Sequence, residues 1–324
     1  MPRARSPAEY SLGAVPVSNQ SYYVILNANA GTANATGISE DTLRDLFVAN
    51  DLTATIDART DCDLSTRLSD AMASEASIIV AAGGDGTITA VAEALVGTNK
   101  SLAILPLGTV NALAKDLHVP LDLPKAVANL VTGHEHRIDV GEVNGRIFLH
   151  KVVIGVIPGV AAGRERIRGR RDASAKIGLL RYFFRRLARA KRLAVVIETA
   201  EGARRIERVQ ALAVASNAYD EGLGQFFSRQ CLDGGTLTLY SLKHLNVRDF
   251  LRLTAGMILG NWQNDEALSM ESITGVTIDT RHALIKVMLD GEVETLNTPL
   301  EFAIRPQALS VIVPAEITAS VEVA

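Results

Sequence analysis

The sequence predicts a two-domain protein, in which a three-layer α/β domain with a parallel sheet precedes a mostly antiparallel β-sandwich. Three observations predict this arrangement. The chain has 324 residues, about twice the usual length of one domain. Its first part alternates apolar strand-like runs with helical patterns of about 10–15 residues. Its second part consists of short β-prone runs separated by turn residues.

The elements of the first domain follow one another in strand–helix order. Ser39 is an expected N-cap, and apolar residues recur at helical spacing behind it. Because strands separated by helices of this length form βαβ units, we expect a parallel sheet. The expected strands are 22–26, 52–56, 78–82 and 102–105, and the expected helices follow Ser39, cover 64–72, extend from the glycine-rich turn to about Leu95, and follow Gly108.

Near residue 139 the pattern of the sequence changes from alternating strands and helices to short β-prone runs. We expect residues 1–20 to be a disordered lead-in, 21–138 the first domain and 139–324 the second, whose C-terminal tail can pack back on the first. The trio His134, Glu135 and His136 is expected in a surface loop rather than at a metal. The β-prone runs of the second domain cover 146–153, 193–198, 210–215, 236–240, 276–278, 283–289 and 309–313, and helices are expected in a basic segment and at 247–262.

Composition excludes several classes of protein. Apolar residues make up 48% of the chain and charged residues 21%, which is typical of a globular protein and excludes a disordered or collagen-like one. Cys62 and Cys231 are too few for a disulfide framework, so we expect a reducing compartment. We find neither a secretory signal nor the roughly 18 consecutive apolar residues that cross a bilayer. We therefore expect a cytoplasmic protein that at most sits on a membrane surface.

One basic segment interrupts an otherwise acidic chain. Residues 164–192 hold twelve Lys or Arg and two acids, a local charge of +10, whereas the whole chain carries −3. Residues 174–192 can form an amphipathic helix whose basic face suits an anionic bilayer. The alternative is a solvated face packed on the second domain, and nucleic acid is disfavoured because no recognition motif is present. The expected membrane-contacting residues are Arg181, Arg185, Arg189 and Arg192.

The most informative motif is a strand that leads through Gly83-Gly84-Asp85-Gly86-Thr87 into a helix. Glycines in such a turn remove the Cβ atoms that would block an anion, and the helix N-terminus then faces the loop. This pattern predicts a phosphate cradle. A carboxylate beside bound phosphates indicates Mg²⁺ between them or a proton-transfer role for Asp85. A tight turn with an Asp cap is the alternative.

Two further polar loops are expected at the same sheet edge. Residues 106–111 follow the next strand and supply Gly108, Thr109 and Asn111, whereas the loop after the first strand supplies Asn27 and Gly31. Ligands of open α/β sheets bind at the carboxyl ends of the strands, so these loops predict a nucleotide site. Neither a Walker A motif nor a first-turn Rossmann fingerprint is present.

The acidic turn Asp290-Gly291-Glu292 follows an expected strand near the end of the chain. A glycine between two acids allows a tight bend that can present both carboxylates to one point. Such a pair suits general-base and metal-ligand work. Considered alone, a solvated hairpin turn is the stronger interpretation.

In this order, the motifs resemble those of the diacylglycerol kinase catalytic-domain family, the soluble bacterial lipid kinases related to sphingosine kinases. The resemblance covers about residues 22–314 and rests on the glycine-rich turn, on 106–111, on Ile138-Asp139-Val140-Gly141 and on the acidic turn. It implies an ATP-binding domain like that of NAD kinases and phosphofructokinases, followed by a lipid-binding sandwich, with the active site in the cleft between them. An ATP- and Mg²⁺-dependent lipid kinase acting at the inner face of the membrane is therefore expected. In this interpretation the helix at 247–262 is an ordinary core helix or lines a lipid tunnel.

The resemblance also implies roles for single residues. Glu292 and Asp290 are expected to activate the lipid hydroxyl, Asp85 to act on the nucleotide side, and Asp85 and Glu292 to contact the ATP-bound Mg²⁺. The residues expected to contact ATP are Asn27, Gly31, Thr60, Gly83, Gly84, Asp85, Gly86, Thr87, Gly108, Thr109 and Asn111.

Several positions depart from the family pattern. Ala28 replaces a usual Pro, Ala112 replaces an Asp or His, and Gly234 replaces an Asp that binds a structural Mg²⁺ in some members. The run that starts at His150 departs from an Asn-rich segment, so the sequence does not identify the lipid. Two alternatives stay open, a kinase for a soluble hydroxyl substrate and a nucleotide-sensing membrane module without catalysis. The oligomeric state is also open, with a homodimer as one option.

Overall fold

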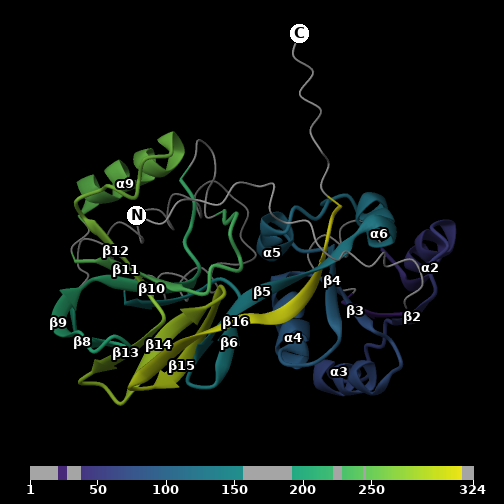
Figure 1. Ribbon diagram of the computed structural model, residues 1–324, viewed down its shortest axis with the longest axis horizontal. Helices are drawn as coiled ribbons and strands as arrows, with labels where there is room; N and C mark the ends of the chain where they lie inside the picture. Colours follow the sequence, from purple (N-terminus) through teal and green to yellow (C-terminus); the bar gives the residue numbers. More distant parts are fainter. Residues whose placement is uncertain (1–20, 28–37, 156–191, 222–227, 244–245, 316–324) are drawn as a thin grey trace, which may run out of the picture. The chain divides into compact units, whose positions relative to one another are not determined.

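The computed structural model describes residues 21–27, 38–155, 192–221, 228–243 and 246–315 (Figure 1). The chain divides into two compact units. The first contains the described residues up to Arg137 together with those from Leu309, and the second runs from Ile138 to Ala308. No helix among the described residues is both long and apolar enough to span a membrane.

The first unit is built on parallel strands in the order β2-β1-β3-β4-β16. Figure 1 shows α3 and α4 on one face of these strands and α2 and α6 on the other, which gives three layers. The strands are β1 (Tyr22–Leu26), β2 (Ala54–Asp57), β3 (Ile78–Gly83), β4 (Ser101–Pro106) and the end of β16 (Leu300–Val313). The helices are α2 (Glu40–Ala49), α3 (Leu64–Ala73), α4 (Asp85–Leu95), α5 (Ala112–Asp116) and α6 (Leu123–Thr132).

Local chemistry explains where these helices begin. The Ser39 hydroxyl accepts the Thr42 N–H and starts α2, and the Asp63 carboxylate accepts the Thr66 N–H at 2.9 Å and starts α3. Strands β1, β3 and β4 are buried along their whole length, as expected of a sheet covered on both faces. The three layers agree with the predicted α/β domain.

The second unit packs two sets of mostly antiparallel strands against each other. One is a six-stranded sheet in the order β12-β11-β10-β7-β14-β15, and the other contains β16, β13, β8, β9, β5 and β6. Side chains from both sets form one apolar core that includes Phe148, Val214 and Phe302. The elements are β5 (His134–Val143), β6 (Arg146–Phe148), β7 (Lys151–Gly155), β8 (Leu193–Thr199), β9 (Arg204–Val209), β10 (Ala211–Ser216), β11 (Leu237–Leu242), β12 (Leu268–Ile273), β13 (Gly275–Thr280), β14 (Leu284–Leu289), β15 (Glu292–Asn297) and α9 (Val247–Leu259).

Some expected elements differ from the observed ones. The trio His134, Glu135 and His136 does not form a surface loop, because it opens strand β5. The expected run 146–153 forms two strands, β6 and β7, and the last expected strand is the end of the longer β16. The sequence did not predict β5, β9, β12 and β15. Of the basic segment, only Arg192 is described, as an exposed residue just before β8. Arg181, Arg185 and Arg189 lie outside the described residues.

Candidate active site

The two glycine loops of the first unit touch through their backbones. The Leu107 N–H donates to the Gly83 carbonyl at 2.9 Å. A Cβ placed on Gly108 would lie 2.7 Å from the Cα of Gly84, and one placed on Gly84 would lie 3.3 Å from the Cα of Gly108. Because a Cβ on Gly108 would overlap the backbone of Gly84, position 108 requires glycine, whereas a Cβ on Gly84 would make a tight contact with the Gly108 backbone. The two predicted loops therefore form one surface at the carboxyl ends of β3 and β4.

Asp85 joins this pair of loops. Its carboxylate accepts the Asn111 N–H at 3.0 Å on one oxygen and the Ala112 N–H at 2.6 Å on the other. These donors lie at the start of α5, so the carboxylate caps a helix that follows the second loop. The capping alternative therefore describes the observed contacts of Asp85, although the capped helix is α5 rather than its own helix α4.

Asn111 shapes the second loop with its own side chain. Its Oδ1 accepts the Gly108 N–H at 2.8 Å and its Nδ2 donates to the Gly108 carbonyl at 2.9 Å. The residue has a φ of 53° and is buried. Its amide is thus engaged by the loop, whereas the neighbouring Thr109 is exposed. Of the two predicted nucleotide contacts here, Thr109 presents its side chain to solvent and Asn111 holds the loop in shape.

The first strand brings Asn27 to the same edge of the sheet. The Asn27 Nδ2 donates to the Thr87 hydroxyl at 3.0 Å, and the Asn27 N–H donates to the Ala82 carbonyl at 2.9 Å. Thr87 is buried beneath Gly83, whose Cβ would lie 2.6 Å from the Thr87 Oγ1. The structure therefore brings Asn27 and the GGDGT turn together, as the sequence predicted. Gly31, the other residue expected from this loop, lies outside the described residues.

A buried ion pair fixes the end of β1 before Asn27. The Arg67 guanidinium donates to the Asp57 carboxylate at 3.1 Å and to the Leu26 carbonyl at 2.9 Å. Burial alone would raise the pKa of Asp57, but hydrogen bonds and charge from Arg59 and Arg67 outweigh it and lower that pKa to about 2. Asp57 is thus a permanent anion at neutral pH. Thr60 is exposed on the segment beyond this pair.

The acidic turn of the second unit is a two-residue hairpin loop. Leu289 of β14 pairs with Glu292 of β15, and Asp290 and Gly291 between them have φ values of 45° and 100°. Positive φ at both positions is what an Asp-Gly hairpin turn requires. The tight bend expected at Gly291 is therefore present.

The two acids of this turn have different surroundings. The Asp290 carboxylate accepts the N–H groups of Leu149, His150 and Lys151 at 2.6, 2.9 and 2.9 Å. Burial raises the pKa of Asp290, and these three donors together with the charge of Arg229 oppose the rise. Glu292 is exposed. Asp290 is therefore an anchor that fixes the turn to the start of β7, whereas Glu292 is accessible to a substrate.

Arg229 lies near Asp290 and was not identified as a candidate site residue from the sequence. The side chain is 1% exposed and donates to the Leu149 carbonyl at 2.7 Å and the Ser216 carbonyl at 2.9 Å. It also lies 2.9 Å from His150 Nδ1. Burial, followed by the charges of Arg229 and Lys151, holds the pKa of His150 well below its usual value of 6.5. The imidazole is therefore neutral, and its Nδ1 accepts from Arg229, because a guanidinium only donates.

The position of the structural Mg²⁺ found in some family members contains a hydrogen-bond network. The Asp139 carboxylate accepts N–H groups from Asn217 at 3.1 Å, Gly235 at 2.6 Å and Gln307 at 2.8 Å. A Cβ on Gly234 would lie 2.9 Å from the Asn217 Oδ1, so this space admits no acidic side chain without a shift. Within the described residues no group of three or more acids, histidines or cysteines is placed to hold a metal. The residues present do not fit this accessory ion.

Comparison with known proteins identifies the family. The diacylglycerol kinase catalytic domain matches residues 21–143. A probable YegS-like lipid kinase of Pseudomonas aeruginosa is 32% identical over 265 residues, which cover 79% of this chain and 82% of that protein. The chain belongs to the diacylglycerol kinase catalytic-domain family. The resemblance predicted from the motifs is thereby confirmed, and so is the expectation of an enzyme of the lipid-kinase class.

Other members of the diacylglycerol kinase family extend the comparison. A diacylglycerol kinase of Bacillus subtilis is 27% identical over 252 residues, covering 75% of this chain and 79% of that protein. The crystal structure of a putative diacylglycerol kinase from Bacillus anthracis shares the fold with a TM-score of 0.67, at 21% identity, and covers 94% and 98% of the two chains. The predicted fold class is confirmed.

Proposed function

We propose that this protein is an ATP- and Mg²⁺-dependent lipid kinase that transfers the γ-phosphoryl group to a lipid hydroxyl. The observation that carries the proposal is the match to lipid kinases over most of the chain, together with the paired glycine loops at the carboxyl ends of β3 and β4. A pair of backbones this close, beside a helix N-terminus, is a surface that phosphates can approach without meeting side chains.

The first unit would hold the nucleotide. Gly84 and Gly86 offer backbone N–H groups at the start of α4, and Thr109 offers an exposed hydroxyl beside them. Asp85 joins the two loops through its hydrogen bonds to the Asn111 and Ala112 N–H groups, and the Asn111 side chain holds the second loop in shape. Mg²⁺ bound to ATP would neutralise phosphate charge during transfer. No complete protein cage for the ion is present among the described residues, which suits an ion held chiefly by the phosphates.

The second unit would supply the base. As the lipid oxygen bonds to the γ-phosphorus and the bond to the leaving ADP oxygen breaks, the hydroxyl proton passes to the Glu292 carboxylate. Asp290, held by three backbone N–H groups, would position the turn that carries Glu292. A general base of this kind contributes about 10²- to 10⁴-fold to the rate.

The lipid substrate implies contact with a membrane. The basic segment at 164–192, with Arg181, Arg185, Arg189 and Arg192, supplies a charge of +10 that suits anionic headgroups. We therefore place the protein at the membrane surface as a peripheral enzyme, with binding that weakens as salt is added.

Incubation with labelled ATP, Mg²⁺ and a total lipid extract tests the proposal, and the labelled product identifies the lipid. Glu292→Gln should lower kcat by about 10²- to 10⁴-fold with little change in ATP binding. Glu294→Gln, two residues further along β15, is the matched control and should retain activity, because Glu294 makes a surface ion pair with Arg146. Unchanged turnover in Glu292→Gln would remove the base assignment. Labelling of a water-soluble acceptor in place of any lipid would favour the alternative soluble substrate.

A further inference from the structure

Helix α9 turns apolar side chains outward. Leu251, Ile258 and Leu259 are 56%, 51% and 65% exposed, although the helix packs on the second unit. Exposed positions recur at helical spacing and form one stripe along the helix. The stripe consists of Arg248, Leu251, Arg252, Ala255, Ile258 and Leu259.

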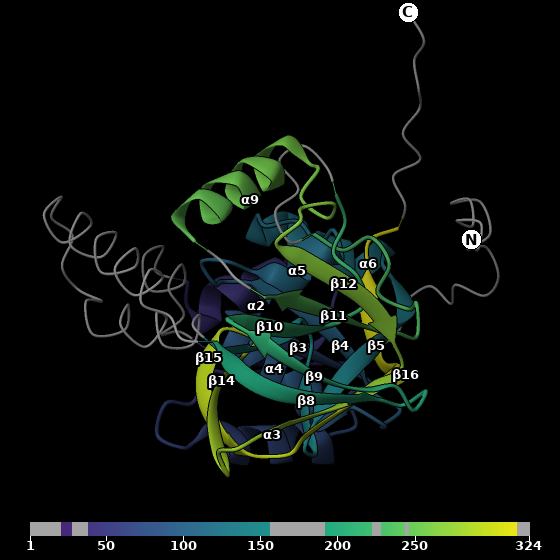
Figure 2. The ribbon, with the colours of Figure 1, turned by 90° about the vertical axis from the view of Figure 1, so that its left-hand side faces the viewer.

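The opposite face fixes the helix to its unit. Leu253 is buried against Ala267, and Met257 packs on the cluster that contains Tyr240 and Trp262. An Asn246–Asp249 capping box closes its N-terminus. Figures 1 and 2 show α9 beside β12 and β11, with no other described element of the second unit drawn over its outer side. The outward stripe is therefore a stable feature of the surface.

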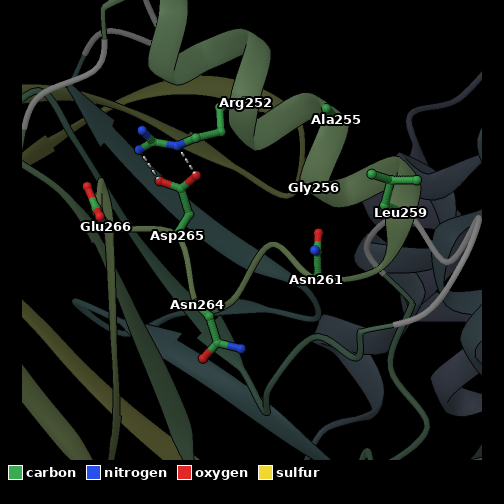
Figure 3. Close-up of a pocket in the computed structure, with 8 residues that line it drawn as sticks. All are labelled: Arg252, Ala255, Gly256, Leu259, Asn261, Asn264, Asp265 and Glu266. Atoms are coloured by element: carbon green, nitrogen blue, oxygen red, sulfur yellow. Dashed lines mark hydrogen bonds and ion pairs between the residues drawn. The ribbon is translucent and has the colours of Figure 1, made fainter.

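A shallow cavity of about 460 Å³ lies along the same helix, next to Ala255 and Leu259. Figure 3 shows the Arg252 guanidinium turned from the helix to Asp265, which it binds through two hydrogen bonds of 2.7 Å. This pair ties the loop after α9 to the helix. The apolar side chains Leu251, Ile258 and Leu259 beside it are exposed in the part of the chain that the structure describes.

The charge on this face matches an anionic surface. The stripe carries no carboxylate, and its Arg248 lies in the first turn of the helix, whereas the guanidinium of Arg252 is paired with Asp265. The one acid within α9, Asp249, is buried in the capping box. Glu266, the exposed acid that borders the cavity, belongs to the following loop rather than to the helix. An exposed apolar stripe accompanied by a cationic side chain on the same helix is typical of helices that lie in a membrane interface.

We propose that the outward stripe of α9 inserts into the interface of an anionic bilayer and is the surface through which the enzyme docks on the membrane that holds its substrate. The inference rests on the proposed lipid-kinase function and adds to it a docking surface separate from the basic segment. Leu251, Ile258 and Leu259 enter the acyl boundary, and Arg248 meets the headgroups. Added salt should not weaken the contribution of the apolar side chains to membrane affinity, whereas it screens the contribution of Arg248.

Vesicle flotation of the full chain tests this surface. The vesicles contain phosphatidylglycerol and phosphatidylcholine in one series and phosphatidylcholine alone in another. In the double variant Leu251→Gln/Leu259→Gln, binding to the anionic vesicles should fall about 25-fold, since withdrawing each exposed leucine from the membrane costs about fivefold. Val48→Gln is the matched control, because Val48 is 68% exposed on helix α2, and its binding should be unchanged. Arg248→Gln should weaken binding about fivefold at low salt and less at high salt.

A second assay separates docking from catalysis. Phosphorylation of a short-chain, monomeric diacylglycerol needs no bilayer, so the double variant should retain wild-type activity on it while losing activity on vesicles. Failure of the wild type to phosphorylate any lipid would overturn the proposed function itself. Wild-type vesicle binding by the double variant would overturn the docking surface and leave the kinase function standing. A wild-type dimer that the double variant converts to a monomer in gel filtration, with vesicle binding unchanged, would assign the stripe to a contact between copies and overturn the inference.

Discussion

Replacing Asp85 with asparagine separates two roles for this carboxylate. The sequence suggested action on Mg²⁺ or on a proton, whereas the structure has both oxygens accepting backbone N–H groups from Asn111 and Ala112. Asparagine keeps one acceptor and places an NH₂ donor against the second N–H. The variant therefore loses one charge-assisted hydrogen bond and leaves a donor unpaired, each worth about 1–3 kcal/mol. Since Asp85 is half-exposed and water can replace part of the loss, we expect a destabilisation of about 2 kcal/mol.

Thermal unfolding without nucleotide and with EDTA measures this effect. A loss of about 2 kcal/mol corresponds to a fall in Tm of about 6 °C for a unit of this size. Asp41→Asn serves as the control, because Asp41 makes an exposed ion pair with Arg44 that should contribute less than about 1 kcal/mol. If Asp85→Asn melts like the wild type in EDTA and is destabilised only when Mg²⁺ is added, Asp85 acts through the ion and the anchoring argument is wrong.

Three further substitutions test other parts of the structure. Gly108→Ala places a Cβ 2.7 Å from the Cα of Gly84, so it should destabilise the first unit by about 1–3 kcal/mol and weaken ATP binding, as calorimetry can measure. The pKa of Asp57 falls from 3.8 in the unfolded chain to about 2 in the fold, so this carboxylate stabilises the fold above pH 4 by about 2 kcal/mol. That contribution is lost as the pH falls from about 4 to 2. The free energy of unfolding, measured as a function of pH, should therefore fall less over this range in Asp57→Asn than in the wild type. Arg229→Lys gives up the planar fork that reaches two carbonyls and His150, so it should cost about 2 kcal/mol and lower kcat with the KM for ATP unchanged. An increase in that KM would instead place Arg229 on the nucleotide side.

The strands that the sequence missed share one physical property. Strands β12 and β15 form the two edges of the six-stranded sheet, and β9 is the last strand in the order of the other set. An edge strand buries less of its surface, so polar residues are tolerated on it and the apolar pattern weakens. Ile206 on β9 is 76% exposed, for example. Central strands such as β3 and β4 were predicted because both of their faces are buried.

Strand β5 was missed for a related reason. His134, Glu135, His136 and Arg137 alternate between half-buried and exposed positions, which is the period of a strand. A surface loop was expected for the trio because no further metal ligand follows at a helical spacing, and the alternation involves no apolar residue until Ile138. Pairing with β16 supplies the backbone hydrogen bonds that make this segment a strand. That partner is about 170 residues away in the sequence, beyond the reach of local patterns.

The two glycine loops were predictable because their chemistry is local. Glycine spacing after a buried strand fixes the turn, and parallel strands bring successive turns to one edge. What the sequence could not give is the direction of each polar side chain. Asn111 satisfies the backbone of its own loop, and Asp85 satisfies the backbone of the next one. The contacts of Asp85 depend on the approach of the two loops at Gly84 and Gly108, which only the fold creates.

In the acidic turn, too, the fold decides the roles of side chains that the sequence leaves equivalent. Asp-Gly between two strands predicts the hairpin, and the hairpin alone leaves both acids equivalent as candidate bases. The fold makes them unequal, because three backbone N–H groups from Leu149, His150 and Lys151 converge on Asp290. A proton placed on Asp290 would displace at least one of these donors, and each displaced donor would lose its acceptor. Glu292 pays no such penalty, since its carboxylate is exposed at the start of β15. Although burial raises the pKa of Asp290, its oxygens already accept three backbone N–H groups and are less accessible to a substrate than the exposed carboxylate of Glu292. The proposed proton transfer is therefore assigned to Glu292, with Asp290 keeping its turn in place.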